Sequence, residues 1–495
     1  MLRKCGYWMV LLLIFYVICV FYIISTLKLN EGQILEKNDL TDDRQNIRGI
    51  QDDIASRRQS EPNVVPVVVE SLEEDVPNLA VGRNILIEKG GVGPFFANQP
   101  KTEGNGKQTA PLPVRSQFRP IGERFYVYSS YFDDRLRDSF IRIVAIGPRK
   151  RPKSKSGLMC IFESQKAKNG TVATDIRLSE TCENHKQLTS FYLMSCLVPN
   201  AVVKQFRQNR QWNFKLKDQK SERDGFILTA VNNRPFRSLN KTRSQFCLCV
   251  PPLYGDLKPL HFVEFMELSL LLGVEHFTFY DYQIGPEIRS IVKVYENLGI
   301  VTVLKWNIPD VRHIWSYGQS ASIADCIYRN MYNFQIVALS DIDEFIIPRH
   351  LESWKTMLAY LENQNRRVAK SVAAYRFKSS FYHGNTENVT SEWRMFKSLS
   401  NILRTKTVSD IRTKLMVYPE TVFELGIHHL SQPIKTHYKT LNVDGNTALV
   451  HHYRNCKDVQ EMTCGQFIED YTAQRYGKVL VENTKRVLRR AKTET

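Results

Sequence analysis

Between residues 246 and 340, short apolar strands alternate with amphipathic helices, and this alternation limits the fold more than any other feature of the chain. The first helix is expected to begin at Pro259 and to end at Gly273, because proline favours the first turn of a helix and glycine the position after its end. Helices between successive strands usually form crossovers in a parallel sheet. The segment therefore predicts an α/β domain with a mainly parallel sheet.

The alternation ends at an acidic motif. The expected strands are residues 246–250, 274–280, 300–304 and 335–339, and the expected helices are residues 259–272, 286–298 and 320–333. The last strand delivers Asp341-Ile342-Asp343 at its carboxyl end. Open parallel sheets bind their ligands at the carboxyl ends of their strands. The motif therefore stands where such a sheet has its site.

Asp341 and Asp343 are the principal candidates for that site. In an extended strand end, residues two apart point the same way, and both carboxylates are expected to address one ion while Ile342 turns into the core. Two carboxylates suit Mn²⁺ or Mg²⁺, and such an ion would neutralise the diphosphate of a nucleotide sugar. The less specific interpretation is a solvated turn or a helix cap. The buried strand before the motif favours a metal site.

Other residues are candidates to support these two acids. His452, or its neighbour His451, follows an apolar strand and is a candidate third metal ligand, with a structural histidine as the alternative. Glu344 is interpreted as a ligand, a base or the partner of an arginine, and a structural role is favoured.

Three further residues are candidates to bind a nucleotide donor. Asp281 ends the second expected strand, where acids bind ribose in nucleotide folds, although a plain turn residue is the alternative. Asp325 and Arg329 are one helical turn apart. A structural ion pair therefore competes with donor binding at these two positions.

The N-terminus predicts a single-pass, type II membrane protein. Residues 1–6 form the expected cytosolic tail, in which Arg3 and Lys4 favour the cytosolic side, and the uncharged residues 7–27 are long enough to cross a bilayer as a helix. A cleaved signal peptide is the alternative, but its apolar core would be shorter. Residues 28–120 are polar and scattered with proline, and they predict a disordered stem. The rest of the chain would then face the secretory lumen.

Cysteines and sequons agree with that compartment. Sequons begin at Asn169, Asn240 and Asn388, and disulfides form in the oxidising lumen. The cysteines beyond the membrane segment are Cys160, Cys182, Cys196, Cys247, Cys249, Cys326, Cys456 and Cys464. Their pairing cannot be read from the sequence. Zinc binding by Cys247 and Cys249 is disfavoured, because the chain offers no matching second pair nearby.

The remaining regions complete the predicted organisation. Residues 121–245 contain short apolar runs separated by turn residues and predict a β-rich accessory module, which precedes a catalytic domain at 246–480 and a basic C-terminal tail at 481–495. The formal charge of +17 and the basic run at 149–155 would suggest nucleic-acid binding in a nuclear protein. Behind a membrane anchor, a solvated basic surface is the better interpretation.

Taken together, several short motifs resemble glycosyltransferase family 92. They are residues 249–255 (CVPPLYG), 262–265 (FVEF), 272–277 (LGVEHF), 325–326 (DC), 341–345 (DIDEF) and 452–454 (HYR), within a match from about 247 to 467. The resemblance implies a GT-A fold, a Golgi membrane location and inverting transfer of galactose from UDP-galactose, with manganese, in β1,4 linkage to a galactose- or fucose-terminated glycan of a glycoprotein. Ala324 stands where the family often has asparagine.

The resemblance also implies roles for individual residues. Asp341 and Asp343 become the residues that bind the metal and the donor diphosphate, and His452 becomes a later metal or phosphate contact. An inverting transfer needs a carboxylate base for the acceptor hydroxyl. Glu387, Glu392 and Glu424 lie beyond the metal motif and are the candidates, with Glu424 ranked first.

Two other classes of protein would use similar residues. A glycosidase needs two carboxylates roughly 5–9.5 Å apart across a sugar, and Asp341 and Asp343 are too close in sequence to straddle a ring comfortably. A membrane-tethered, calcium-dependent glycan-binding protein would use the acids to hold an ion that orients a sugar without turnover. Chelation of the metal and release of UDP distinguish the three.

Overall fold

The computed structural model describes residues 117–493, apart from the segments 123–124, 150–156, 165–169, 221–224, 235–242, 311–312, 385–388 and 459–463. The expected cytosolic tail, the membrane helix at 7–27 and nearly all of the stem lie outside the described residues. The sequon asparagines and Glu387 lie outside them as well. Among the helices that are described, none is both long and apolar enough to cross a membrane.

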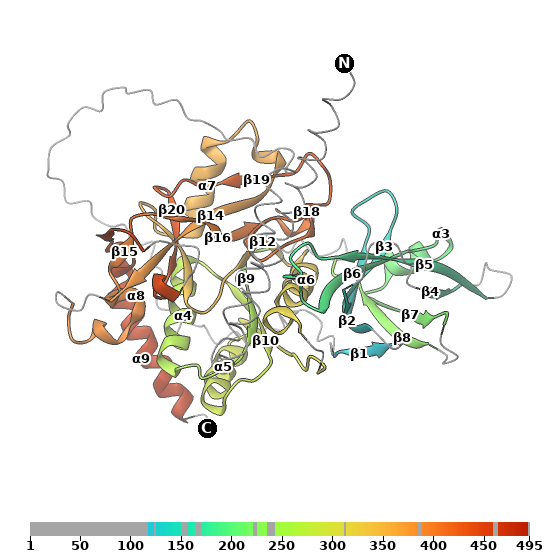
Figure 1. The fold of residues 1–495 in the computed structure, drawn as a ribbon, viewed down its shortest axis with the longest axis horizontal. Coiled ribbons are helices and arrows are strands. Elements are labelled where there is room, and N and C mark those ends of the chain that lie inside the picture. Colours follow the sequence, from blue (N-terminus) through green and yellow to red (C-terminus); the bar gives the residue numbers. More distant parts are fainter. Residues whose placement is uncertain are drawn as a thin grey trace, which may run out of the picture. The chain divides into compact units, whose positions relative to one another are not determined.

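Residues 119–231 form an eight-stranded sheet that closes on itself (cyan to green in Figure 1). The strand order is β1-β2-β3-β6-β5-β4-β7-β8, and β8 returns to β2 where Val231 pairs with Tyr131. The elements are β1 Arg119–Ile121, β2 Phe125–Asp133, β3 Phe140–Pro148, β4 Leu158–Glu163, β5 Thr171–Glu180, β6 Thr189–Leu197, α3 Asn200–Gln208, β7 Gln211–Asp218 and β8 Phe226–Val231. The β-rich character expected for this region is observed, and closure into a barrel was not foreseen.

Alternating side chains fill the interior of this barrel. Along β4, Leu158, Cys160 and Phe162 are buried while the residues between them are partly exposed, which is the period of a strand with one face inward. A disulfide joins Cys160 to Cys196 of β6. The barrel therefore has an apolar core of its own.

The next segment forms the expected alternation of strands and helices. Its elements are β9 Ser244–Leu253, α4 Pro259–Leu272, β10 His276–Asp281, α5 Pro286–Asn297, β11 Val301–Lys305, η1 Trp315–Gly318, α6 Gln319–Asn330 and β12 Phe334–Leu339. The four strands are parallel in the order β11-β10-β9-β12. Helix α4 begins at Pro259, and Gly273 ends it with a left-handed φ of 112°.

The rest of the sheet corrects the expectation of a mainly parallel arrangement. Strand β12 pairs antiparallel with β16, which pairs antiparallel with β14, and the eleven-stranded sheet is mixed. Its further elements are β13 Glu344–Pro348, α7 Trp354–Gln364, η2 Ala369–Ser371, β14 Val372–His383, η3 Trp393–Met395, α8 Lys397–Ser400, β15 Leu403–Thr405, β16 Ser409–Val417, η4 Pro419–Thr421, β19 Lys439–Asn442, β20 Ala448–His452, η5 Cys456–Asp458, β21 Phe467–Glu469 and η6 Thr472–Tyr476. A small hairpin pairs β17 Val422–Glu424 with β18 Gln432–Pro433.

Residues 481–493, expected to be part of a basic tail, form most of helix α9 Gly477–Thr493 instead. Leu480, Val487 and Ala491 lie on one face at helical spacing and are buried in the core that also contains α4 and α5. The tail was predicted from its positive charge, and that prediction overlooked the apolar residues that recur at helical spacing between the basic ones.

A second core joins the barrel to the parallel strands. It contains Phe118, Tyr128 and Tyr131 beside Trp306 and residues of α6. The ring of Trp306 lies 4.5 Å from that of Tyr128 and 5.0 Å from that of Phe118. Tyr128 also donates a hydrogen bond to the carbonyl of Lys305 at 3.2 Å. The barrel and the α/β sheet therefore share apolar side chains.

Candidate active site

Asp341, Ile342 and Asp343 form a turn between β12 and β13, and the prediction of an extended strand end is wrong. The amide of Glu344 donates to the carbonyl of Asp341 at 3.1 Å, which closes the turn. The chain must reverse here because β13 leaves to pair with β20 while β12 pairs with β9 and β16. Ile342 packs partly buried against the core, as expected.

A buried lysine lies beneath this turn. Strand β16 pairs with β12, and this register brings Lys414 to the turn. Its ammonium lies 2.6 Å from Asp341 Oδ2 and 2.7 Å from Glu344 Oε2. The side chain of Lys414 is only 2% exposed, and a buried ammonium needs such partners. The partner of Glu344 is therefore Lys414, and not an arginine as the sequence analysis suggested.

His452 reaches the same cluster from β20. The antiparallel pairing of β13 with β20 sets Glu344 opposite His452. The ring nitrogen Nε2 lies 3.5 Å from Asp343 Oδ2, and Nδ1 lies 3.4 Å from Glu344 Oε1 without hydrogen-bond geometry. The amide of Tyr453 donates to the carbonyl of Asp343 at 2.9 Å. These contacts bring Asp341, Asp343, Glu344 and His452 together, as the sequence predicted.

His451 has a different environment. It is fully buried, its Nε2 lies 2.9 Å from the hydroxyl of Tyr382, and the two rings stack. Burial and, to a smaller extent, nearby arginines lower the pKa of His451 to about 3 against the opposing effect of Asp470. His451 is therefore a neutral structural histidine, and His452 is the member of the pair that faces the acids.

The charges of the cluster are strongly coupled. Burial acts to raise the pKa of Asp341, but the Lys414 ammonium outweighs it and holds that pKa well below its usual range. Burial raises the pKa of Glu344 to about 7, because the lowering by Lys414 is offset by the charge of Asp341. For His452, burial lowers the pKa, but Glu344 and Asp343 outweigh it and the net shift is upward.

Exposure divides these residues into an outer and an inner pair. The side chains of Asp341 and Asp343 are 37% and 35% exposed, whereas those of Lys414 and Glu344 are 2% and 3% exposed. Asp341 and Asp343 are therefore the carboxylates that a ligand from solvent meets first.

The donor set fits a metal ion that is held jointly with a ligand. In the described part of the chain, no three His, Cys, Asp or Glu side chains are close enough to hold a metal ion by themselves. Two outward carboxylates with an adjacent imidazole nonetheless match the way Mg²⁺ and similar ions bind, through one or two carboxylates together with substrate phosphates. Asp341, Asp343 and His452 are the residues that would hold it.

A small, narrow cleft borders the cluster near the carboxyl ends of β9, β10 and β12. Its lining residues are Cys249, Val250, Pro251, Tyr280, Gln319, Ser322, Ile323, Leu339, Ser340, Lys414 and Ile427. Ser340 precedes the acidic turn, and Lys414 binds it. The cleft therefore occupies the position where open parallel strands bind ligands.

Three tyrosines form an aromatic surface, two of them directly after the carboxyl ends of β9 and β10, and no pattern in the sequence indicated it. The ring of Tyr317 lies 4.4 Å from that of Tyr254 and 4.7 Å from that of Tyr282. Tyr254 and Tyr317 are 43% and 39% exposed. Burial raises the pKa of Tyr254, and the charge of Asp341 contributes to the rise, which ties this surface to the acidic turn.

The backbone beneath Tyr317 is strained. Ser316 and Tyr317 have positive φ angles of 44° and 54°, which side chains other than glycine rarely adopt. Trp306 Nε1 donates to the carbonyl of Tyr317 at 2.8 Å and holds this conformation. Strain of this kind persists where the surrounding structure fixes it, and it often marks a ligand site.

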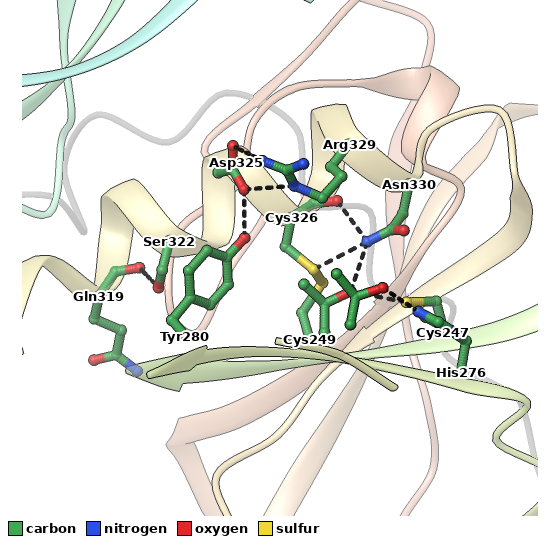
Figure 2. Close-up of a disulfide and its surroundings, with 12 residues drawn as sticks. Cys247, Cys249, His276, Tyr280, Gln319, Ser322, Asp325, Cys326, Arg329 and Asn330 are labelled. Carbon is green, nitrogen blue, oxygen red and sulfur yellow. Dashed lines mark hydrogen bonds and ion pairs between the residues drawn. A yellow bond between two sulfur atoms is a disulfide. The ribbon is translucent and has the colours of Figure 1, made fainter. Parts of the chain in front are cut away.

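Asp325 and Arg329 lie in a buried network in Figure 2. Arg329 pairs with Asp325 at 2.9 Å, and the hydroxyls of Tyr280, Ser129 and Tyr131 also donate to Asp325. Both charged side chains are at most 3% exposed. Of the two interpretations of Asp325 and Arg329, the geometry favours a structural ion pair over donor binding. The network around this pair joins α6 to β10 and to the barrel.

Figure 2 also shows the Cys249–Cys326 disulfide, which ties α6 to β9. Cys456–Cys464 is a further disulfide, and the prediction of disulfides is confirmed for six of the eight cysteines, but not for Cys182 and Cys247. Asp281 ends β10 as expected, accepts from the amide of Ile284 at 3.1 Å and pairs with Arg289 at 2.6 Å. It therefore caps the turn before α5.

The candidate bases occupy separate surroundings. Glu392 is 47% exposed and pairs with Lys485 of α9. Glu424 is buried and accepts from Thr181 Oγ1 at 3.2 Å and from the amide of Cys182 at 3.3 Å. Burial raises the pKa of Glu424. Both carboxylates thus have structural partners, and Glu387 lies outside the described residues.

Comparisons with known proteins identify a family of glycosyltransferases. The family model described as glycosyltransferase family 92 matches residues 244–491. A β-1,4-galactosyltransferase of Caenorhabditis elegans is 27% identical over 361 residues, which cover 70% of this chain and 78% of that protein. A galactan β-1,4-galactosyltransferase of Arabidopsis thaliana is 24% identical over 229 residues, covering 45% of this chain and 44% of that protein. Among solved structures, TarS of S. aureus matches 42% of this chain and 60% of its own, with 11% identity and a TM-score of 0.24, which is too low to carry an argument.

Proposed function

Because the chain belongs to glycosyltransferase family 92, we propose that it transfers galactose from UDP-galactose, with inversion, to a galactose- or fucose-terminated glycan in β1,4 linkage. The observation that carries the proposal is the pair of outward carboxylates, Asp341 and Asp343, at the carboxyl end of β12 and beside a cleft. The galactosyltransferase names of the two relatives support the donor and the linkage. Four parallel strands, three of which border the cleft, support a GT-A architecture.

The donor diphosphate is assigned to the acidic turn together with Mn²⁺ or Mg²⁺. The ion, when bound, would neutralise the charge that develops on the leaving diphosphate. Asp341 and Asp343 would hold the ion, with His452 beside Asp343. Lys414 fixes the carboxylate of Asp341 from below, and Glu344 holds Lys414 in turn. This arrangement keeps the two outward carboxylates oriented before the donor arrives.

Removal of divalent metal is expected to abolish transfer. Full-length protein in detergent would be incubated with a panel of UDP-sugars and a β-galactose- or fucose-terminated acceptor, with Mn²⁺ or with EDTA, and UDP release and product would be measured. UDP-galactose with Mn²⁺ should give product, and activity lost to EDTA should return when Mn²⁺ is restored.

The same experiment separates the competing functions. Sugar hydrolysis without UDP release would support a glycosidase, and glycan binding without turnover of any UDP-sugar would support a glycan-binding protein. Either result would overturn the proposal.

The tyrosine surface is proposed to stack on the uracil base of the donor. Nucleobases stack on exposed aromatic rings, and each such contact contributes about 1–3 kcal/mol. The charge of Asp341 contributes to the raised pKa of Tyr254, so the rings lie near the acidic turn. A nucleotide whose diphosphate binds at that turn would therefore have these rings within reach of its base.

Replacing Tyr317 with alanine is expected to weaken UDP binding about tenfold, which corresponds to a stacking contribution of about 1.4 kcal/mol. The loss should appear in the Kd for UDP measured by calorimetry with Mn²⁺ present. Tyr360 of α7 is similarly exposed, at 44%, and Tyr360→Ala is the matched control that should bind UDP normally. If Tyr317→Ala binds UDP with the same affinity as the wild type, the uracil base does not stack on this surface.

A location in the Golgi membrane, with the described residues in the lumen, is part of the proposal. Three disulfides in the described region support an oxidising compartment. The proposed acceptors are glycans of glycoproteins in that compartment.

A further inference from the structure

Gln319, the first residue of α6, carries a buried carboxamide that the acidic turn does not use. The residue is 7% exposed and lines the cleft. A hydrogen bond from Ser322 Oγ reaches its backbone carbonyl, and in the described part of the chain the carboxamide itself has no partner. Figure 2 shows this side chain extending from α6 toward the sheet. Buried polar groups normally have a partner, and one without a protein partner marks a place for water or a ligand.

The other polar side chains of the cleft already donate to protein partners. Their hydrogen bonds run to the carboxylates of Asp325 and Asp341 and to two backbone carbonyls. These side chains are Tyr280, Ser322, Ser340 and Lys414. The carboxamide of Gln319 is therefore the polar group of this cleft that remains available to a ligand.

The chemistry and the size of the cleft favour a hydroxyl group as that ligand. A carboxamide donates through Nε2 and accepts through Oε1, and a hydroxyl likewise donates and accepts, whereas a phosphate oxygen only accepts. Between its walls, the cleft has room for about one water-sized group, which is the size of a hydroxyl. A sugar ring is too large to enter. The cleft therefore fits a hydroxyl that projects from a ligand bound above it.

The surroundings of Gln319 hold it in place. The Cys249–Cys326 disulfide joins α6 to β9, and Cys249 itself lines the cleft. Gly318 precedes α6 with a positive φ of 81°, and a Cβ at this position would lie 2.9 Å from Ile308 Cδ1. The start of α6 is therefore closely packed. A carboxamide that is fixed in this way loses little freedom when a ligand binds.

The cleft adjoins both parts of the site that are assigned to the donor. Gln319 follows Tyr317 of the tyrosine surface by two positions, and Ser340 directly precedes Asp341 of the acidic turn. Gln319 and Ser340 both line the cleft. In a nucleotide, the ribose joins the base to the phosphates. A donor with its base on the tyrosine surface and its diphosphate on the acidic turn would therefore have its ribose, with the 2′ and 3′ hydroxyls, at the cleft.

We propose that the carboxamide of Gln319 binds a hydroxyl of the donor ribose and makes the site selective for ribonucleotides. This inference rests on the proposed function, from which it takes the positions of the base and the diphosphate. A deoxynucleotide that lacks the hydroxyl would leave the buried carboxamide without a partner. A site built to hydrogen-bond a hydroxyl rejects an analogue without it for this reason.

The test compares UDP with 2′-deoxy-UDP and 3′-deoxy-UDP. Their Kd values would be measured by calorimetry on full-length protein in detergent with Mn²⁺ present. We expect at least one of the deoxynucleotides to bind the wild type about tenfold more weakly than UDP, which is the usual effect of losing one hydrogen bond to a buried group. Gln319→Met keeps the length of the side chain without its polar atoms. It should bind UDP about as weakly as the wild type binds that deoxynucleotide, and it should no longer distinguish the two.

Two further variants separate the ribose contact from other effects. Gln211 is exposed on β7 of the barrel, and Gln211→Met should bind all three nucleotides like the wild type. Tyr317→Ala should weaken all three by the same factor, because it removes a contact to the base and leaves the ribose contact intact.

The outcomes distinguish this inference from the proposed function. Circular dichroism would verify that Gln319→Met is folded, and the wild-type comparison needs no variant. A wild type that binds UDP and both deoxynucleotides equally, or a folded Gln319→Met that keeps the preference for UDP, would overturn the role of Gln319 and leave the proposed function intact. A wild type that binds no UDP at all would overturn the proposed function, and this inference with it.

Discussion

Replacement of Asp343 with alanine is expected to reduce kcat/KM for UDP-galactose with Mn²⁺ by at least about 100-fold. A metal ion at a leaving diphosphate supplies several kcal/mol of transition-state stabilisation, and each 1.4 kcal/mol changes the rate about tenfold. Asp343 is one of two outward carboxylates, and His452 Nε2 lies 3.5 Å from it. The variant removes the group without exposing a buried charge, because the side chain is already 35% exposed.

A matched control distinguishes this loss from a general effect of removing an acid. Asp175 is exposed on β5 of the barrel, and Asp175→Ala should keep full activity. Thermal unfolding of both variants would verify that the fold is intact. Full activity of Asp343→Ala would show that the acidic turn is not the donor site, while membership of the family would stand.

Replacement of Asp325 with alanine is expected to lower the free energy of unfolding by about 3–5 kcal/mol. The change leaves the fully buried guanidinium of Arg329 without its charge partner, and breaking a buried pair from one side costs about this much. It also leaves the buried hydroxyls of Tyr280 and Tyr131 without their acceptor. Urea unfolding followed by tryptophan fluorescence would measure the loss.

The appropriate control for Asp325 is an acid with an exposed partner. Asp410 is 65% exposed where it pairs with Lys378, and Asp410→Ala should cost less than about 1 kcal/mol. The remaining folded Asp325→Ala protein should bind UDP with unchanged affinity, because the carboxylate is buried in the network. A stable Asp325→Ala protein with weakened UDP binding would instead make Asp325 a donor-binding residue.

Local signals in the sequence were sufficient for the parallel half of the sheet. Pro259 and Gly273 mark the ends of α4 because each favours that position through its own backbone geometry. The strand before Asp341 could be identified because an apolar run of that length is typical of a buried strand. The sequence alone therefore identifies three candidates for the site, which are Asp341, Asp343 and His452.

The rest of the site depends on contacts between distant segments. Lys414 lies beneath the acidic turn only because β16 pairs with β12, and nothing in the residues around 414 specifies that partner strand. A lysine that directly precedes the apolar residues Leu415, Met416 and Val417 was the available signal. The tyrosine surface likewise combines three loops, and the positive φ angles of Ser316 and Tyr317 have no signature in sequence.

The core shared by the barrel and the parallel strands bears on where this protein can be divided. Residues 244–491 match the family, yet Trp306 and the apolar face of α6 are covered by Phe118, Tyr128 and Tyr131 of the preceding segment. Asp325 likewise takes two of its hydroxyl donors from β2. A boundary drawn at residue 244 would open apolar surface to water and remove partners of a buried charge. The region that defines the family by sequence is therefore smaller than the unit that can fold.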